Sequence, residues 1–322
     1  MRLLHKILAG AALLCSIVAP AAAQSDYPNK PIRWIVAYPP GGTTDLLARL
    51  MAQYLSTKLG QQVIIENRAG GGNNIGTEAA VRAAPDGYTI QLVNPANAIN
   101  ATLYPKLSFN YLDDMVPVAG IVRVPNVMTV TKNFPARTVA EFIDYAKKNP
   151  GKVNMASSGA GTSVHLSGEL FKYMAGIDMK HVPYKGAGPA TTDLIGGQVD
   201  VLFDNMPSII AHIRQGSVRA LGVTSAQRSP ALPDVPAIAE TVPGYEASAW
   251  FGAAAPKGTP RPVIDRLNRE FNAALADPVM KARLADLGGV PIPGTPEQFW
   301  ALHRMETEKW ARIVHFSGAK VD

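Results

Sequence analysis

Short apolar runs alternate with amphipathic segments along most of this chain, and that alternation restricts the possible folds more than any other feature. Residues 32–37 have the pattern of a buried strand, and apolar side chains then recur at helical spacing until Gly60. Strands are predicted at 63–65 and 88–93, with a short helix near 77–82 between them. This succession predicts an α/β fold in which helices flank an open, mostly parallel sheet.

A second series of strands and helices begins after a long extended run at 117–130. Pro125 interrupts that run, so we predict a connection between two lobes rather than one central strand. A chain of this length also suits two domains of about 150 residues each. We expect a first lobe at 27–124 plus 226–322 and a second lobe at 125–225. The predicted elements of the second lobe are helices at 138–148, 189–195 and 208–214, and strands at 152–156, 199–203 and 218–223.

The first residues have the composition of an export signal. Arg2 and Lys6 precede an apolar run at 7–18, which is followed by small residues up to Ala23. A basic start, an apolar middle and a small-residue end are typical of a signal peptide, here at 1–23 with cleavage after Ala23. The apolar run is shorter than the ~20 residues that span a membrane. We expect the rest of the chain to reach the periplasm.

Charge and cysteine content exclude several classes of protein. The formal net charge is +6, and removal of Arg2 and Lys6 with the signal leaves +4, spread along the chain. No basic tract or nucleic-acid-binding motif is present in the sequence, so nucleic acid is not an expected partner. The single cysteine, Cys15, lies in the signal, so no disulfide framework is expected afterwards. The mild basicity indicates at most a weak preference for anionic ligands.

Two glycine-rich turns stand at strand-to-helix junctions. The first, in "YPPGGTTDLL", follows the strand at 32–37, and the second, in "SSGAGTSVH", follows the strand at 152–156. Glycine lets the backbone approach a ligand, and the exposed N–H groups of a helix N-terminus favour an anion. If the lobes face each other, a carboxylate between the two turns gains donors and favourable dipole ends from both sides. The alternative is that both turns are only well-capped helix starts.

Asp45, just after the first turn, is a carboxylate that would repel an anionic ligand if it faced the site. Arg49 follows four residues later, at the spacing of an ion pair on a helix surface. We therefore interpret Asp45 as structural.

Enzyme signatures are incomplete in this sequence. Ser157 and Ser158 follow a strand, but Met155 and Ala156 stand where the first glycine of a nucleophile elbow would lie. His165 is in the first turn of a helix, where a capping or pocket-edge role is favoured over catalysis. The other histidines lack paired metal-ligand spacing, and the glycine-rich segments lack the phosphate-loop lysine and the full dinucleotide fingerprint. We predict no catalytic residue, no metal and no cofactor.

Several motifs occur together and in order: "YPPGGTTDLLARLM", "VIIENRAGGGNNIGTEAAVRAAPDGYTI", "ASSGAGTSVHLSGELF", "VPYKGAGPATTDLIGGQVDVLFDN" and "LPDVPAIAE". Over essentially the whole chain after the signal, these resemble the Bug-type (TctC) solute receptors of tripartite tricarboxylate transporters. The resemblance implies a two-lobed periplasmic binding protein of type II, a Venus-flytrap fold. Each lobe is then a mostly parallel sheet flanked by helices, and a ligand carboxylate is held between two strand-to-helix loops, partly through ordered water.

The resemblance also implies which residues bind the ligand. At Asn94 and Asn97 this sequence has asparagines in a stretch where the family usually has serine or threonine followed by histidine. For Asp204, a structural hydrogen bond and a contact to a ligand ammonium or hydroxyl group are equally open. Trp250 and Phe251 either wall the pocket or fill the core. The implied ligand contacts are Tyr38, Pro39, Gly41, Gly42, Thr43, Thr44, Asn94, Asn97, Ser157, Ser158, Gly159, Ala160, Gly161, Thr162, His165, Phe203 and Asp204.

The function implied by this resemblance is capture of a small carboxylate and its delivery to the membrane subunits of a tripartite tricarboxylate-type transporter. A ligand sensor for a signalling receptor would use the same pocket, and an exported hydrolase is the enzymatic alternative. The ligand stays open among a C4-dicarboxylate, a citrate-like tricarboxylate, an acidic amino acid and an aromatic acid such as terephthalate. Closure of the two lobes on the ligand is the expected signal to the membrane partner, and we expect a monomer.

Overall fold

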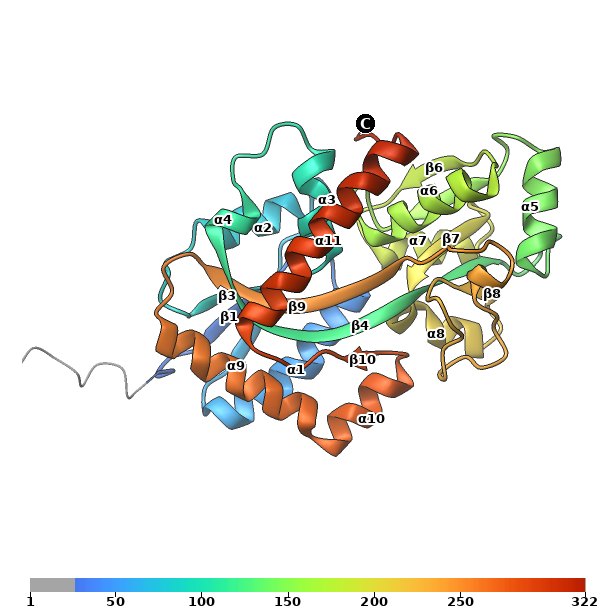
Figure 1. Ribbon diagram of the computed structural model, residues 1–322. Coiled ribbons are helices and arrows are strands. Elements are labelled where there is room, and N and C mark those ends of the chain that lie inside the picture. Colours follow the sequence, from blue (N-terminus) through green and yellow to red (C-terminus); the bar gives the residue numbers. More distant parts are fainter. Residues whose placement is uncertain (1–26, 322) are drawn as a thin grey trace, which may run out of the picture.

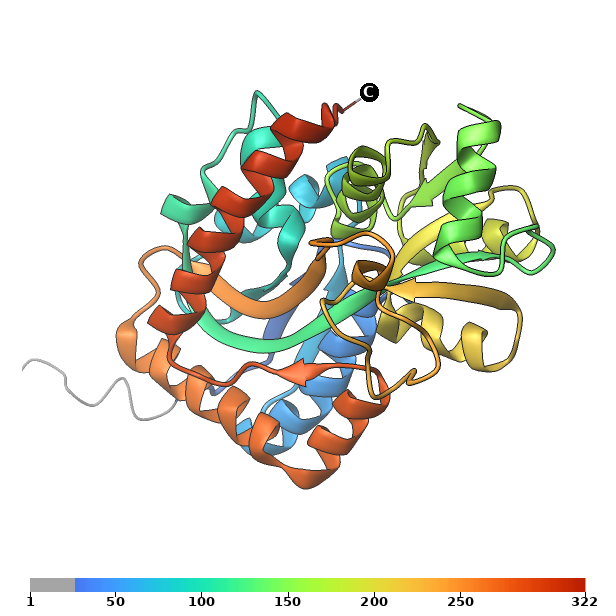
Figure 2. The same ribbon diagram turned by 45° about the vertical axis from the view of Figure 1, so that its right-hand side comes forward.

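The computed structural model describes residues 27–321 of the 322-residue chain. The predicted signal peptide, at 1–23, lies outside the described residues. The described chain is an α/β fold with two halves side by side and one long strand shared between them (Figures 1 and 2). No helix among residues 27–321 is both long and apolar enough to cross a membrane.

Helices and strands of the first half alternate as the sequence pattern predicts. Helix α1 (Thr43–Leu59) begins directly after the first glycine turn and ends at Gly60, whose φ of 68° suits a residue without a side chain. The other elements up to residue 114 are the strands β1 (Ile32–Val36), β2 (Val63–Asn67) and β3 (Thr89–Val93), the helices α2 (Asn74–Val81), α3 (Pro95–Leu103) and α4 (Tyr111–Asp114), and the 3-10 turn η2 (Gly71–Asn73).

The second half repeats this alternation. Helix α5 (Val139–Lys148) is capped by Thr138, and strand β8 (Val218–Val223) has the predicted bounds. The other elements of this half are the strands β5 (Asn154–Ser157), β6 (Lys180–Pro183) and β7 (Val201–Asn205), and the helices α6 (Ser163–Ala175), α7 (Ala187–Ile195) and α8 (Met206–Arg214). The chain then closes with the 3-10 turn η3 (Ile238–Glu240), the strands β9 (Ser248–Pro256) and β10 (Val290–Pro291), and the helices α9 (Arg261–Ala276), α10 (Pro278–Asp286) and α11 (Pro296–Ser317).

Strand β4 (Met115–Thr131) is 17 residues long and belongs to both halves. It pairs with β9 up to Pro125, with β7 from Asn126 on and with β8 from Val127 on. The prediction that Pro125 prevents a single strand here is therefore wrong. Proline is tolerated because it lies at the end of one ladder and before the start of the next, where a missing N–H costs little.

The strand order places the carboxyl ends of the parallel strands at the meeting point of the two halves. The order is β2-β1-β3-β9-β4-β7-β5-β6, with β8 and β10 both paired to β4. Strands β1, β2 and β3 are parallel to one another, as are β5, β6 and β7, whereas β9 is antiparallel to β3 and β4. Ligands of such sheets bind beyond the carboxyl ends of the strands, where the following helices begin.

An apolar core lies in each half, and a third core includes residues of both halves. Helices α1 and α9 pack together against one face of the first sheet, where the rings of Trp34 and Phe271 meet edge to face at 5.4 Å. In the second half, Leu202 and Val223 contribute to a core that includes residues of α7 and α8. Helix α11 crosses the first sheet on its other face and touches α6 of the second half (Figure 1). The halves are thus joined by contacts of α11 as well as by β4.

Candidate functional site

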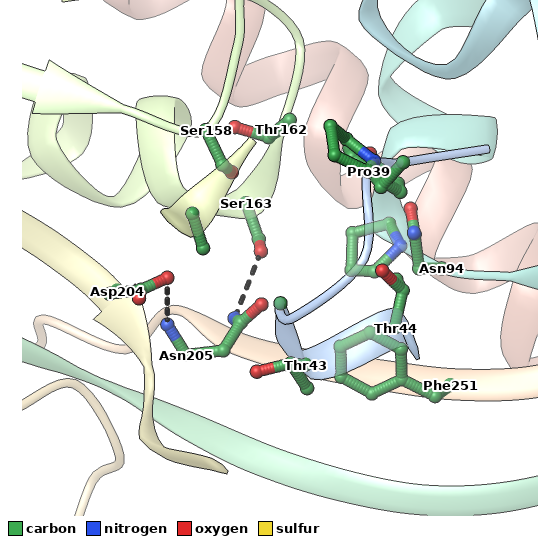
Figure 3. A pocket seen from close by; sticks show the side chains of 14 residues that line it. Pro39, Thr43, Thr44, Asn94, Ser158, Thr162, Ser163, Asp204, Asn205 and Phe251 are labelled. Carbon is green, nitrogen blue, oxygen red and sulfur yellow. Dashed lines mark hydrogen bonds between the residues drawn. The ribbon is translucent and has the colours of Figure 1, made fainter. Parts of the chain in front are cut away.

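A cavity open to solvent lies where the carboxyl ends of strands from both halves meet, and its space of about 420 Å³ includes solvent at its mouth (Figure 3). Both glycine turns reach it. Within the described chain its lining includes no lysine, arginine or histidine, and Asp204 is the one charged residue. The lining residues are Tyr38, Pro39, Gly42, Thr43, Thr44, Asn94, Pro95, Ser158, Thr162, Ser163, Ala187, Asp204, Asn205 and Phe251.

Five helices of the described chain, α1, α3, α6, α7 and α8, begin at this cavity. For each of them, the N-cap residue or the first helical residue lines it. The first N–H groups of a helix have no partner within the helix, and the helix dipole adds partial positive charge at the same end. The helix ends at the cavity are therefore electropositive, and an anion beside them can be held without a basic side chain.

Helices α1, α7 and α8 have no side-chain cap in the described structure. The N-cap residues of α1 and α7 are Gly42 and Gly186, whereas α8 begins beside the carboxylate of Asp204, which would repel an anion. In α3, by contrast, the N–H of Ala96 already donates to the side chain of Asn94 at 2.9 Å, and Pro95 has no N–H. Direct hydrogen bonds to an anion are thus expected from α1 and α7, whereas α3 contributes mainly its dipole.

Thr43 supplies a hydroxyl group at the start of α1. The residue is 3% exposed and its Oγ1 has no hydrogen-bond partner among the described residues. Leaving a buried hydroxyl unpaired costs about 1–3 kcal/mol. In Figure 3 its oxygen points away from Phe251, toward the side of the cavity on which Asn205 lies. A ligand oxygen at this position would restore the missing hydrogen bond.

The second glycine turn holds its shape through its own hydrogen bonds. The Oγ1 of Thr162 donates to the carbonyl of Gly159 at 2.7 Å and accepts the N–H of His165 at 3.2 Å. Ser157 Oγ accepts the N–H of Gly159 and lies 2.7 Å from Nε2 of His181. This leaves the neighbouring Ser158, which lines the cavity, without such a role in the turn.

Asp45 stabilises the first glycine turn from the side that faces away from the cavity. Its carboxylate is 3% exposed and accepts hydrogen bonds from the N–H of Gly41 at 3.0 Å, Nε of Arg49 at 2.9 Å and Nδ2 of Asn67 at 3.0 Å. Burial by itself would raise the pKa of Asp45, but hydrogen bonds from Arg49, Asn67 and Gly41 outweigh it and lower the pKa. The predicted pair with Arg49 is confirmed, and Asp45 is not part of the cavity lining described above.

Comparison with known proteins identifies the family. Residues 47–318 match the family described as "Tripartite tricarboxylate transporter family receptor" (TctC). The chain belongs to this receptor family. The protein BugT of Bordetella pertussis is 40% identical over 308 residues, which cover 95% of this chain and 94% of BugT.

Two solved structures of Rhodopseudomonas palustris proteins show the same fold as this TctC receptor. Rpa4515 with adipate has a TM-score of 0.90 and 36% identity, covering 92% of this chain and all of the other. MatC (Rpa3494) with bound malate has a TM-score of 0.86 and 32% identity, covering 89% of this chain and all of the other. The predicted fold, a two-lobed α/β binding protein of the periplasmic type, is confirmed.

The structure divides the predicted ligand contacts of the receptor into two groups. Those that line the cavity are Tyr38, Pro39, Gly42, Thr43, Thr44, Asn94, Ser158, Thr162 and Asp204. Those that lie outside the lining are Gly41, Asn97, Ser157, Gly159, Ala160, Gly161, His165 and Phe203. Most of the second group supports the turns rather than facing the cavity, as with Gly41, whose N–H binds Asp45.

Asn97 and Phe203, which were predicted to contact the ligand, instead make contacts within the fold. Asn97 Oδ1 accepts the N–H of Asn94 at 3.0 Å, and its Nδ2 donates to Oγ1 of Thr77 at 3.0 Å. It borders a second cavity on the other side of α3. Phe203 is fully buried in the core, with its ring centroid 5.5 Å from that of Phe171.

His165 is buried behind the second glycine turn. It is 2% exposed, and its ring stacks on that of His181 with centroids 3.9 Å apart. Burial, helped by the charges of His181 and Lys172, lowers the pKa of His165 well below its usual value. The imidazole is therefore neutral at physiological pH, and its Nδ1 accepts the N–H of Gly161 at 3.4 Å.

Sequence reasoning missed Pro95, Ala187 and Asn205, although it placed their neighbours Asn94 and Asp204 at the ligand. Pro95, Ala187 and Asn205 reach the cavity because their helices also start at carboxyl ends of parallel strands. Inspecting every strand-to-helix junction, and not only the glycine-rich ones, would have pointed to them. Phe251 both lines the cavity and is 1% exposed, whereas Trp250 is fully buried beside His303.

Replacement of Asp45 with alanine is expected to lower the free energy of unfolding by about 1–3 kcal/mol at pH 7, because the donors of Gly41 and Asn67 lose their acceptor. Asp45 has a lower pKa folded than unfolded, so its contribution is complete above about pH 4 and is lost as pH falls below it. Urea unfolding at pH 7 and pH 3 should therefore show a smaller difference between variant and wild type in acid.

The matched control is Asp265→Ala on the exposed face of α9. Asp265 also pairs with an arginine four residues away on the same helix, since Nε of Arg261 donates to it at 2.7 Å. Its side chain, however, is 49% exposed. Exposed pairs of this kind contribute little to stability. Equal losses for Asp45→Ala and Asp265→Ala would contradict the supporting role of Asp45.

Among residues 27–321, no group of three or more histidine, cysteine, aspartate or glutamate side chains is placed to hold a metal ion. The two histidines that stack behind the second turn, His165 and His181, belong to the packing of that turn.

Proposed function

We propose that this receptor captures a small carboxylate in the cavity between its two halves and delivers it to the membrane subunits of a tripartite tricarboxylate-type transporter. The observation that carries the proposal is the convergence of five helix N-termini on a cavity whose described lining has no basic side chain. Such a site suits a carboxylate, whose oxygens accept several N–H and O–H hydrogen bonds at once. The adipate and malate bound in related structures support the same ligand class.

The proposed ligand joins the two halves. From the first half, the N-terminus of α1 and the hydroxyl of Thr43 face the cavity, and from the second half Ser158 and the N-terminus of α7 do so. The halves already approach closely beside it, since a Cβ added at Gly42 would lie 3.5 Å from Cβ of Ala187. A ligand that bonds to both sides stabilises this closed arrangement over an open one, and closure is the change that a membrane partner can recognise.

The proposed lobes are 27–124 plus 226–322 and 125–225, with the hinge where the chain crosses between them. At the crossing, Thr224 Oγ1 accepts the N–H of Asn126 at 2.7 Å. The segment 225–247 also contacts the second half through a bridge between Val223 and Ala237. We propose that this segment, counted above with the first lobe, moves with the second lobe during closure, so that the second lobe extends to about residue 247.

We propose a binding protein without catalytic activity or cofactor, acting as a monomer in the periplasm. Export is supported by the predicted signal at 1–23. Ser157 and His181 form the Ser–His contact that a hydrolase would need, but Ser157 is fully buried and does not line the cavity. A sensor for a signalling receptor would use the same site and differ only in its partner.

Carboxylates are expected to stabilise the mature protein against heat, whereas neutral amides of the same acids are not. A ligand at about 100 times its dissociation constant adds ~2.7 kcal/mol, a shift of several degrees in Tm. The measurement is a thermal-shift screen with mono-, di-, tri- and aromatic carboxylates after refolding from denaturant to remove retained ligand. Equal shifts with acids and their amides, or no shift with any acid, would count against the proposed function.

A further inference from the structure

The end of strand β7 gives the cavity a wall of hydrogen-bond acceptors. Asp204 is 1% exposed and lines the cavity, and Asn205 follows it. In Figure 3 the two residues lie on the side opposite Pro39 and Asn94. The Asp204 carboxylate accepts the N–H of Asn205 at 2.9 Å on one oxygen and the hydroxyl of Ser208 at 2.6 Å on the other. Each oxygen keeps a further lone pair for a donor.

The orientation of the Asn205 amide follows from a chain of hydrogen bonds. The carbonyl of Ser163 can only accept, so the atom of Asn126 that lies 3.3 Å from it must be the donor Nδ2. Oδ1 of Asn126 is then the acceptor for Nδ2 of Asn205 at 2.5 Å. Consequently the remaining side-chain atom of Asn205, Oδ1, is an acceptor, and in Figure 3 it lies on the side of Asn205 away from Asp204.

This acceptor wall has no cation to neutralise it within the described lining. No lysine, arginine or histidine lines the described cavity, and the carboxylate of Asp204 is buried. Burial raises the pKa of Asp204 to about 6, against the opposing hydrogen bonds from Ser208 and Asn205. An ionised Asp204 repels a ligand that offers only carboxylates, and it attracts a ligand that brings a donor.

We propose that Asp204 and Asn205 receive an N–H or O–H donor of the ligand, so that the receptor selects carboxylates that carry an ammonium or hydroxyl group. The inference rests on the proposed function, because the same cavity must hold the carboxylate. The helix N-termini then bind the carboxylate, and the acceptors of Asp204 and Asn205 bind the ammonium or hydroxyl group. The two sources of the donor, an amino acid and a hydroxy acid, share this chemistry.

Isothermal titration of the mature protein at pH 7.5 tests the proposal with two matched sets of acids. The first set is succinate, malate and aspartate, and the second is adipate, 2-hydroxyadipate and 2-aminoadipate. Within a set the skeleton is constant and only the substituent changes. We expect at least one substituted acid to bind about 10- to 100-fold more tightly than its unsubstituted parent, the range expected for a hydrogen bond to a charged group.

The variant Asp204→Asn is expected to reduce that preference to within a few-fold, with the unsubstituted acid bound more tightly than by wild type because a repelling charge is gone. Ser158→Ala is the comparison variant, because Ser158 lies on the other turn and should weaken all acids of a set alike. Thermal melts establish that both variants are folded. If a variant does not fold, the comparison of the six acids on the wild-type protein still tests the proposal.

The outcomes separate the inference from the function on which it rests. If parent and substituted acids bind wild type with equal affinity, the acceptor-wall inference is overturned, although carboxylate binding stands. If Asp204→Asn folds and keeps the full preference, the assignment to Asp204 is likewise overturned. If none of the six acids binds, the proposed carboxylate function itself has failed for these ligand sizes.

Discussion

Leucine in place of Gly42 is expected to weaken carboxylate binding at least ~100-fold, about 2.7 kcal/mol, while the protein remains folded. Gly42 has φ −85° and ψ 173°, an extended conformation that any residue adopts, so the substitution causes no backbone strain. The added side chain would project from the cavity wall at a point only 3.5 Å from Cβ of Ala187. It would fill the ligand space and hold the two halves apart, so both binding and closure are lost.

The control for this substitution is Gly188→Leu on α7. Gly188 is exposed, is not one of the lining residues, and an added Cβ would have no described atom within 4 Å. Gly159 is unsuitable, because its φ of 127° would strain any other residue whether or not ligand binds there. Titration calorimetry and thermal melts of the Gly42 and Gly188 variants give affinity and stability separately. A folded Gly42→Leu protein with wild-type affinity would refute the two-turn site.

The glycine turns could be found from sequence because their signal is local. An apolar strand, a glycine pair and capping residues lie within a dozen positions, and each turn is placed by its own hydrogen bonds, such as those of Asp45 and Thr162. The same locality explains why the bounds of α5 and β8 were predicted closely. Local patterns also predicted that Asp45 pairs with Arg49, four residues along the same helix.

The remaining parts of the site depend on long-range arrangement. Ala187 and Asn205 reach the cavity only because β6 and β7 are parallel to β5 and end at the same edge as it does. Pro125 sits at a change of partners that becomes visible only when the pairing of β4 with β9 and β7 is known. No local sequence pattern predicts either of these arrangements. Side-chain direction was the other limit, since adjacent residues of a strand face opposite sides.

Phe203 and Asp204 illustrate that limit on strand β7. The sequence placed both near the ligand, but Asp204 lines the cavity and Phe203 lies in the core against Phe171. Phe203→Ala is therefore expected to reduce the free energy of unfolding by about 3–5 kcal/mol, the usual cost of removing a fully buried aromatic ring. The dissociation constant of the remaining folded protein should change by less than about threefold, a free-energy difference of ~0.7 kcal/mol.

Phe251→Ala is the matched comparison, because Phe251 is nearly as buried at 1% exposure but also lines the cavity. It should lower stability by a similar amount and change the affinity as well, since the ligand loses an aromatic wall. Denaturant unfolding measures the first effect, and calorimetric titration at a temperature where both variants are folded measures the second. A large loss of affinity in Phe203→Ala, equal to that in Phe251→Ala, would mean that β7 presents Phe203 to the ligand in solution and that the cavity extends into what is here the core.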